Sequence, residues 1–292
     1  MTDPWKTGRL VAAWSILVSA ILAAGNLTGG WLAGSTSVIA IGVEFVGDVI
    51  SSTVVLAGML IGAKPADDNH PYGHGRMETL TSLAVGIILV AGGIGISYRS
   101  LQEVDRIHQP PGLFTIWLLL GTIVTRAIMS TVKFRVGRHI RSSSLIADAW
   151  NDSVDILSAA TALVAVGLTL YKPDRFLAAD HYGGFAVGVV VVFTGLNVLR
   201  GSSMELMDVM PDQRFLDEIR SVAFSVPGIL GVEKCLARKS GVQYYVDLHV
   251  EVDPNLTVRE SHELAGMVRS RLRQELTWVA DVLIHVEPSP TI

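Results

Sequence analysis

Six stretches without Asp, Glu, Lys, Arg or His dominate the first two thirds of this 292-residue chain, and they lie at 10–43, 49–63, 79–98, 109–125, 156–171 and 182–199. A helix needs about 20 mostly apolar residues to cross the hydrocarbon core of a bilayer. Each stretch reaches that length when neighbouring apolar residues or a few buried polar ones are included. The pattern predicts six transmembrane helices, at about 10–33, 36–62, 78–100, 112–136, 144–171 and 181–205.

The lysines and arginines of the short loops predict an orientation, because cytoplasmic loops carry an excess of them. One set of loops holds nine: Lys6, Arg9, Lys64, Arg76, Lys133, Arg135, Arg138, Arg141 and Arg200. The opposite set holds four: Arg99, Arg106, Lys172 and Arg175. We therefore expect a multi-pass protein, most simply of the cell inner membrane, with both termini in the cytoplasm.

The composition changes from apolar to mixed charge near residue 210, which predicts a membrane domain at 1–210 and a separate domain at 211–292. Helical periodicity covers 212–224, and Thr257 with Glu260 forms a capping box that opens a second helix, to about 276. Strand patterns cover 232–239, 243–251 and 279–286. Ser240-Gly241 is a hairpin signal between the first two strands. The predicted order is α-β-β-α-β, which is typical of a two-layer α+β fold.

Acidic residues inside two of the predicted spans are the strongest functional signal in the chain. Each ionisable group at the centre of a helix costs roughly 2.5–3.5 kcal/mol to place in a bilayer. Several such groups need compensation, and a shared cation is the simplest source, so the chain is a candidate metal-ion transporter. The carboxylate and carboxamide residues of these two helices are Glu44, Asp48, Asp148, Asn151, Asp152 and Asp155.

A second group of candidate metal ligands lies in the C-terminal domain. His249 alternates with the apolar residues of the second strand, and His285 and Glu287 share one face of the last strand. His262 lies near the start of the second helix. Imidazole and carboxylate together suit divalent transition metals, although ordinary surface polarity is the plainer explanation for any one of these residues alone.

Four sequence features resemble the cation diffusion facilitator family. They are the run His70-Pro-Tyr-Gly-His74-Gly-Arg76-Met-Glu78 after the second span, the acidic pair in that span, Ala147-Asp148-Ala149 at the start of the fifth, and Asp247-Leu-His249-Val-Glu251. The resemblance covers about residues 10–288. It implies a homodimer of six-helix protomers with a ferredoxin-like cytoplasmic domain. Such proteins are secondary transporters, not enzymes, and export divalent metals in exchange for protons. No nucleic-acid partner is expected.

The resemblance also implies three metal sites. The transport site comprises Glu44, Asp48, Asn151 and Asp155. Helical spacing leaves Asp152 as a possible substitute ligand for Asn151, since Asp148, Asn151, Asp152 and Asp155 fall within an arc of about 100°. A loop site comprises Asp67, His70 and His74. A cytoplasmic site, for metal binding and dimerisation, comprises Glu233, His249, His262, His285 and Glu287.

Two departures from the family pattern bear on the metal. In zinc and iron members of the family, a histidine would stand at the position of Asn151, and an aspartate or histidine at the position of Glu44. The resulting all-oxygen site suits harder ions, so we expect a substrate among Fe²⁺, Mn²⁺ and Zn²⁺, with zinc least favoured. Arg126, in the cytoplasmic half of the fourth span, either snorkels to the membrane surface or pairs with a carboxylate such as Asp148.

Two other functions compete with transport. The alternative is a non-transporting homologue, a metal sensor or scaffold that signals through its cytoplasmic domain. The intact carboxylates of the transport site argue against this alternative. An intramembrane metal-dependent hydrolase would want histidine ligands, and the interiors of the predicted spans contain none.

Overall fold

The computed structural model describes the backbone of residues 4–33, 36–102, 114–171 and 173–290. Side chains are described over the same ranges except at 30, 33, 36–41, 43–44, 99–100, 114–115, 162, 165–171, 173–184 and 187. The chain divides into two compact units, Met1–Ser202 and Ser203–Ile292, where the composition alone predicts a boundary at 210. We describe each unit by itself.

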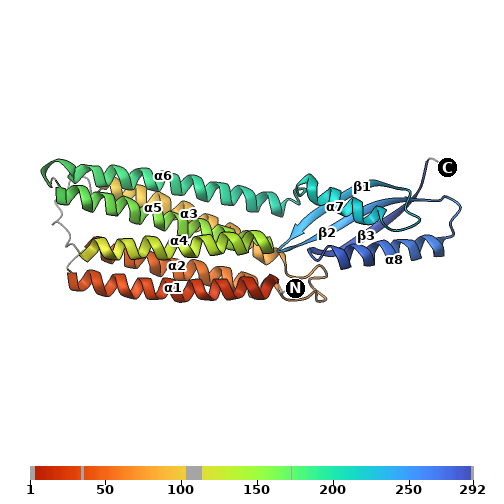
Figure 1. Cartoon of the computed structure of the whole chain (residues 1–292), viewed down its shortest axis with the longest axis horizontal. Coiled ribbons are helices and arrows are strands. Elements are labelled where there is room, and N and C mark those ends of the chain that lie inside the picture. Colours follow the sequence, from red (N-terminus) through yellow and green to blue (C-terminus); the bar gives the residue numbers. More distant parts are fainter. Residues whose placement is uncertain (1–3, 34–35, 103–113, 172, 291–292) are drawn as a thin grey trace. The chain divides into compact units, whose positions relative to one another are not determined.

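Six long helices form the first unit (Figure 1): α1 Pro4–Ala33, α2 Thr36–Gly62, α3 Arg76–Gln102, α4 Phe114–Ile140, α5 Ser143–Tyr171 and α6 Pro173–Leu206. Among the described residues, α1, α2, α3, α4 and α6 each contain a segment long and apolar enough to cross a membrane. The described part of α5 carries three aspartates and is not among these segments. The protein is thus a multi-pass helical membrane protein, as predicted, and several helices extend beyond the predicted spans.

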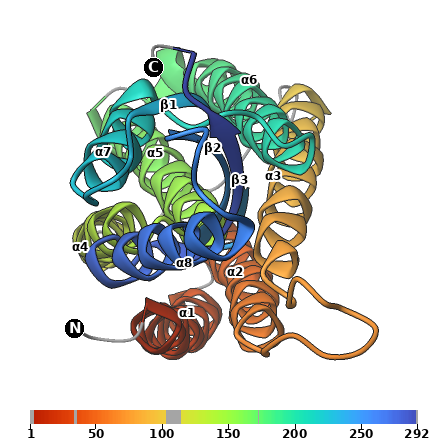
Figure 2. The same cartoon turned by 90° about the vertical axis from the view of Figure 1, so that its right-hand side faces the viewer.

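The side chains of this unit are distributed as a bilayer requires. Large apolar residues face outward, including Ile21, Trp31 and Phe193, whose side chains are all exposed. The interior holds many buried polar and charged side chains in addition to its apolar clusters. Helix α5 lies in the middle and contacts α2, α3 and α4 (Figure 2). This arrangement places the polar face of α5 against its neighbours and away from lipid.

Helices α3 and α6 pack closely through glycine. A Cβ atom added at Gly93 would lie 2.8 Å from the carbonyl oxygen of Gly188 and 2.8 Å from the amide nitrogen of Val192. One at Gly92, the neighbouring position, would meet no atom within 4 Å. Small residues let membrane helices approach at this distance, so Gly93 has a packing role that Gly92 lacks.

The second unit contains α7 Gln213–Phe224, β1 Gly231–Ser240, β2 Gln243–Val252, α8 Val258–Glu275 and β3 Val279–Pro288. The sheet order is β1-β2-β3, with β1 and β2 antiparallel and β2 and β3 parallel. Apolar residues of both helices and of one sheet face form a single core. Gly241 has φ +66° in the turn between β1 and β2, and the capping box of Thr257 and Glu260 is present. The predicted α-β-β-α-β order is confirmed, and it gives the ferredoxin-like fold.

Candidate functional site

Helix α5 supplies most of the candidate site, and a buried glutamate holds its start. Glu78, the last residue of the His70–Glu78 run, is 0% exposed in the first turn of α3. Its Oε1 accepts hydrogen bonds from the Ser142 hydroxyl at 2.7 Å and from the Ser144 amide at 2.6 Å. Free amides at a helix N-terminus favour such a carboxylate. Glu78 thus fixes the position of α5 relative to α3, a role that the sequence pattern alone did not indicate.

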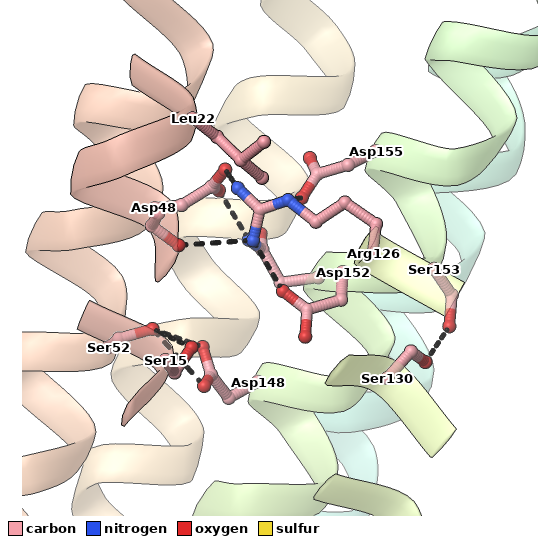
Figure 3. Close-up of polar contacts among 12 residues, drawn as sticks. Ser15, Leu22, Asp48, Ser52, Arg126, Ser130, Asp148, Asp152, Ser153 and Asp155 are labelled. Atoms are coloured by element: carbon pink, nitrogen blue, oxygen red, sulfur yellow. Dashed lines mark hydrogen bonds and ion pairs between the residues drawn. The ribbon is translucent and has the colours of Figure 1, made fainter. Parts of the chain in front are cut away.

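Four buried aspartates gather where α2 and α5 meet α4 (Figure 3). Asp48 comes from α2, and Asp148, Asp152 and Asp155 come from α5, with exposed fractions between 1% and 9%. The positions on α5 are spaced by three and four residues, which places them on one side of the helix. The sequence predicted this shared face correctly.

The guanidinium of Arg126, from α4, lies among three of these carboxylates. Its Nη2 forms an ion pair with Asp48, its Nη1 donates to Asp152 Oδ1 at 2.8 Å, and its Nε lies 3.3 Å from Asp155 Oδ2. Arg126 is 1% exposed, and its guanidinium also lies 4.5 Å from the centroid of the Phe45 ring. The snorkelling alternative is therefore wrong. Pairing with a carboxylate is correct, although Asp148 is not one of its partners.

Lys133 is a second buried cation, and its predicted position in a loop is wrong. It was counted among the loop residues, yet it lies inside α4 with 0% exposure. Its Nζ lies 2.7 Å from Asp148 Oδ2 and 2.7 Å from Asp152 Oδ2. Removing Lys133 from the loop count leaves eight positive residues against four, so the predicted orientation is unchanged.

The two cations and four carboxylates form one cluster with a formal net charge of −2, all six groups ionised, over the side chains that the structure describes. Its members are Asp48, Asp148, Asp152, Asp155, Arg126 and Lys133. Buried charges persist only when they are paired. The pairing explains how the apolar unit tolerates so many ionised groups, and the residual charge equals that of one divalent cation with opposite sign.

Asn151 and Asp152 differ in their surroundings. The Asn151 Nδ2 donates to Asp48 Oδ1 at 2.6 Å, so this amide lies directly against a candidate ligand. Both oxygens of Asp152 contact cationic groups, one from Arg126 and one from Lys133. Of the aspartates that contact Arg126, only Asp152 also contacts Lys133 in the described part of the chain, whereas Asp48 also accepts from Asn151. The side chain of Glu44 lies outside the described part of α2.

Serine hydroxyls extend the network toward α1. The Ser19 hydroxyl accepts from Arg126 Nη1 at 3.1 Å. The Ser52 hydroxyl lies 3.3 Å from both Asp148 oxygens and 3.0 Å from the Ser15 hydroxyl. All three serines are buried. These residues support the aspartates and the arginine, and only their position in charge-free helices pointed to them.

The loop between α2 and α3 brings Asp67, His70 and His74 together. One ligand atom from each lies within 4.8 Å of the other two. Asp67 Oδ1 accepts from the His70 amide at 2.7 Å and lies 3.0 Å from its Nδ1, and Asp67 Oδ2 is 3.6 Å from His74 Nε2. The hydrogen bond from the His70 amide is the main reason that the pKa of Asp67 is lowered. The trio has the donor set of an exposed metal site.

The open face of the C-terminal sheet carries a similar cluster of His249, His285 and Glu287. Glu287 Oε1 lies 2.6 Å from His249 Nδ1 and 3.6 Å from His285 Nε2. Glu233 approaches His249 at 3.8 Å, and its hydrogen bond with Glu287 raises the pKa of Glu233 and lowers that of Glu287. Within the described part of a single chain, His262 is exposed on α8 and does not join this cluster.

Comparison with known families gives the two units an identity. The profile described as "Cation efflux transmembrane domain" matches residues 12–207, and "Cation efflux protein, cytoplasmic domain" matches residues 211–289. This chain belongs to the cation efflux, or cation diffusion facilitator, family. It is a multi-pass transporter of divalent metal cations, and not an enzyme.

Individual relatives match over nearly the whole chain. The manganese efflux system proteins MneP and MneS of Bacillus subtilis are each 28% identical. The match covers 97% of this chain and 97% of MneP, and 98% of this chain and 97% of MneS. Metal tolerance protein C1 of Arabidopsis thaliana is 30% identical, and the match covers 98% of this chain and 64% of the plant protein. A relative that matches end to end shares both units, the membrane helices and the C-terminal domain.

Proposed function

We propose that this protein exports Mn²⁺ from the cytoplasm in exchange for protons, working as a homodimer with both termini in the cytoplasm. The observation that carries the proposal is the convergence of Asp48, Asn151 and Asp155 in one buried cluster. Oxygen ligands of this kind suit hard divalent ions. Neither α2 nor α5 contains a histidine.

The choice of metal rests on the ligands and on two relatives. Imidazole favours zinc, while carboxylate and carbonyl oxygens favour ions such as Mn²⁺. Two relatives that match end to end are named as manganese efflux proteins. Fe²⁺ is the second candidate substrate and Zn²⁺ the third.

Proton exchange follows from competition for the same oxygens. A bound divalent cation keeps the carboxylates of Asp48 and Asp155 ionised. When the metal leaves, desolvation and mutual repulsion favour the protonated form. Alternating access would then come from rocking of helices around this buried position.

The C-terminal unit supplies the dimer and a regulatory site. The family description of residues 211–289 as a cytoplasmic domain supports its location. Metal held by His249, His285 and Glu287 would shift the population of the dimer only if it binds one conformation better than another. Metal held by Asp67, His70 and His74 would likewise shift the population of the dimer only if it binds one conformation better than another.

Purified protein in proteoliposomes with an imposed proton gradient tests the proposal. Uptake of Mn²⁺, Fe²⁺ and Zn²⁺ is compared for wild type, Asp155→Ala and Asn151→His, with Asp68→Ala as a control at an exposed carboxylate. We expect Asp155→Ala to lose uptake, Asn151→His to shift preference toward Zn²⁺, and Asp68→Ala to match wild type. Uptake that does not depend on the imposed proton gradient would contradict antiport. If wild type transports no ion but still binds metal through its C-terminal unit, the sensor alternative is correct.

A further inference from the structure

We propose that Arg126 is a tethered competitor of the transported metal, a built-in cation that occupies the ligands and must withdraw before the metal can bind. The inference rests on the proposed function of the site. Two of the three carboxylates that its guanidinium contacts, Asp48 and Asp155, are the proposed metal ligands. The oxygens of Asp48 and Asp155 cannot bind a metal ion and pair with a guanidinium at the same time.

The contacts of Arg126 divide into a part that competes and a part that anchors. The competing contacts run from Nη2 to Asp48 and from Nε to Asp155. The anchoring contacts run from Nη1 to Asp152 at 2.8 Å and to the Ser19 hydroxyl at 3.1 Å. Because the anchors involve neither proposed ligand, the guanidinium can release Asp48 and Asp155 while it keeps a charged partner (Figure 3).

Lys133 holds the anchor in place. Its Nζ contacts the second oxygen of Asp152 and one oxygen of Asp148, so Asp152 stays paired whether or not Arg126 moves. Arg126 and Lys133 are seven residues apart on α4, which places them on one face of the helix, two turns apart. The two cations thus have different tasks: Lys133 compensates Asp148 and Asp152 permanently, and Arg126 compensates part of the charge of the ligands when metal is absent.

This arrangement has consequences for metal binding and for net transport. A competitor lowers the apparent affinity in proportion to the fraction of protein in which the ligands are free. It also compensates part of the charge of the ligands during the return step, when protons compensate the rest. Removing it should therefore tighten metal binding and slow net transport, while exchange of metal for metal across the membrane persists.

The test measures Mn²⁺ binding and flux with full-length protein carrying Arg126→Gln, Arg126→Lys or, as a matched control, Arg135→Gln at an exposed arginine of the same helix. Binding at the transport site is defined as the part lost in Asp48→Asn. If the free-ligand state is about one tenth of the metal-free protein, Arg126→Gln lowers the apparent Kd roughly tenfold. We expect its net uptake to fall and its metal–metal exchange to continue. The apparent Kd of Arg126→Lys should lie between those of wild type and Arg126→Gln, because one ammonium cannot contact three carboxylates.

An unchanged or weaker affinity in Arg126→Gln would overturn the inference. Should that variant fail to fold, infrared difference spectra of wild type with isotope-labelled arginine supply an independent measurement. Addition of Mn²⁺ should change guanidinium bands, and the change should be missing in Arg126→Lys; spectra without any guanidinium change would refute withdrawal.

The outcomes for Asp48→Asn separate this inference from the proposed function. If Asp48→Asn keeps full metal binding and transport, the proposed site itself is wrong. If Asp48→Asn loses both but Arg126→Gln binds metal no more tightly than wild type, the site is right and only the role of Arg126 is wrong.

Discussion

Replacing Lys133 by methionine should destabilise the membrane unit more than any exposed change of similar size. The ammonium is 0% exposed and lies 2.7 Å from two carboxylates that are each 1% exposed. Removing one partner of a buried ion pair costs about 3–5 kcal/mol, because the other charge stays buried without compensation. For a unit of roughly 200 residues, about 2–4 °C of Tm corresponds to each kcal/mol, so the apparent Tm should fall by roughly 6–20 °C.

The assay is thermal unfolding of chelator-treated protein in detergent at one fixed scan rate, with Arg135→Met as the control at an exposed cation of α4. The double variant Lys133→Met with Asp148→Asn should recover about 1–3 kcal/mol of the lost stability, because one of the two carboxylates left without Lys133 is then neutral. A Tm for Lys133→Met equal to that of the control would refute the reasoning. So would a double variant that is less stable than the sum of its single changes.

Three further predictions concern other parts of the chain. Gly93→Ala should cost about 1–3 kcal/mol through the close contact of α3 with α6, whereas Gly92→Ala, which meets open space, should be near neutral in the same thermal assay. His285→Ala should reduce the metal ions bound per full-length chain by one in equilibrium dialysis, and His139→Ala, an exposed imidazole on α4, should not. Thr257→Ala should return the lowered pKa of Glu260 part of the way toward its usual 4.5, because it removes the Thr257 hydroxyl, the larger cause of the shift, and leaves the Thr257 amide. The stabilisation from this cap is full above the usual pKa and lost as pH falls through the lowered one, so the Tm difference from wild type should shrink there.

The sequence predicted the fold well because each helix and strand follows from a pattern that extends over many consecutive residues. Charge-free stretches predicted the six helices, and alternation in β2 correctly predicted which of its residues face the core. The helix ends were less accurate: α1 begins at Pro4 and α6 at Pro173, earlier than predicted. Where a helix leaves the apolar core it can continue in water, and hydropathy does not register that continuation.

The candidate site was only partly predictable, and its cations show why. The face of α5 followed from helical spacing. The partners of that face depend on how α4 packs against α5, which no single helix encodes. Loop-charge counting assigned Lys133 to the cytoplasmic side, yet its spacing of seven residues from Arg126 was a usable signal. Two cations on one face of a membrane helix require buried carboxylates on a neighbour, and only α5 offers three in the described part.

A cation transporter gains from cations in its own site because its substrate must leave as well as bind. Four carboxylates around one metal would hold a divalent ion too tightly for turnover, and transport sites must bind strongly enough to load but weakly enough to release. Arg126 and Lys133 reduce the described cluster to a net charge of −2. A monovalent ion would leave one negative charge uncompensated in low dielectric, and a divalent ion leaves none. The two cations together therefore set the charge that the site accepts, and the movable one, Arg126, sets how readily the metal leaves.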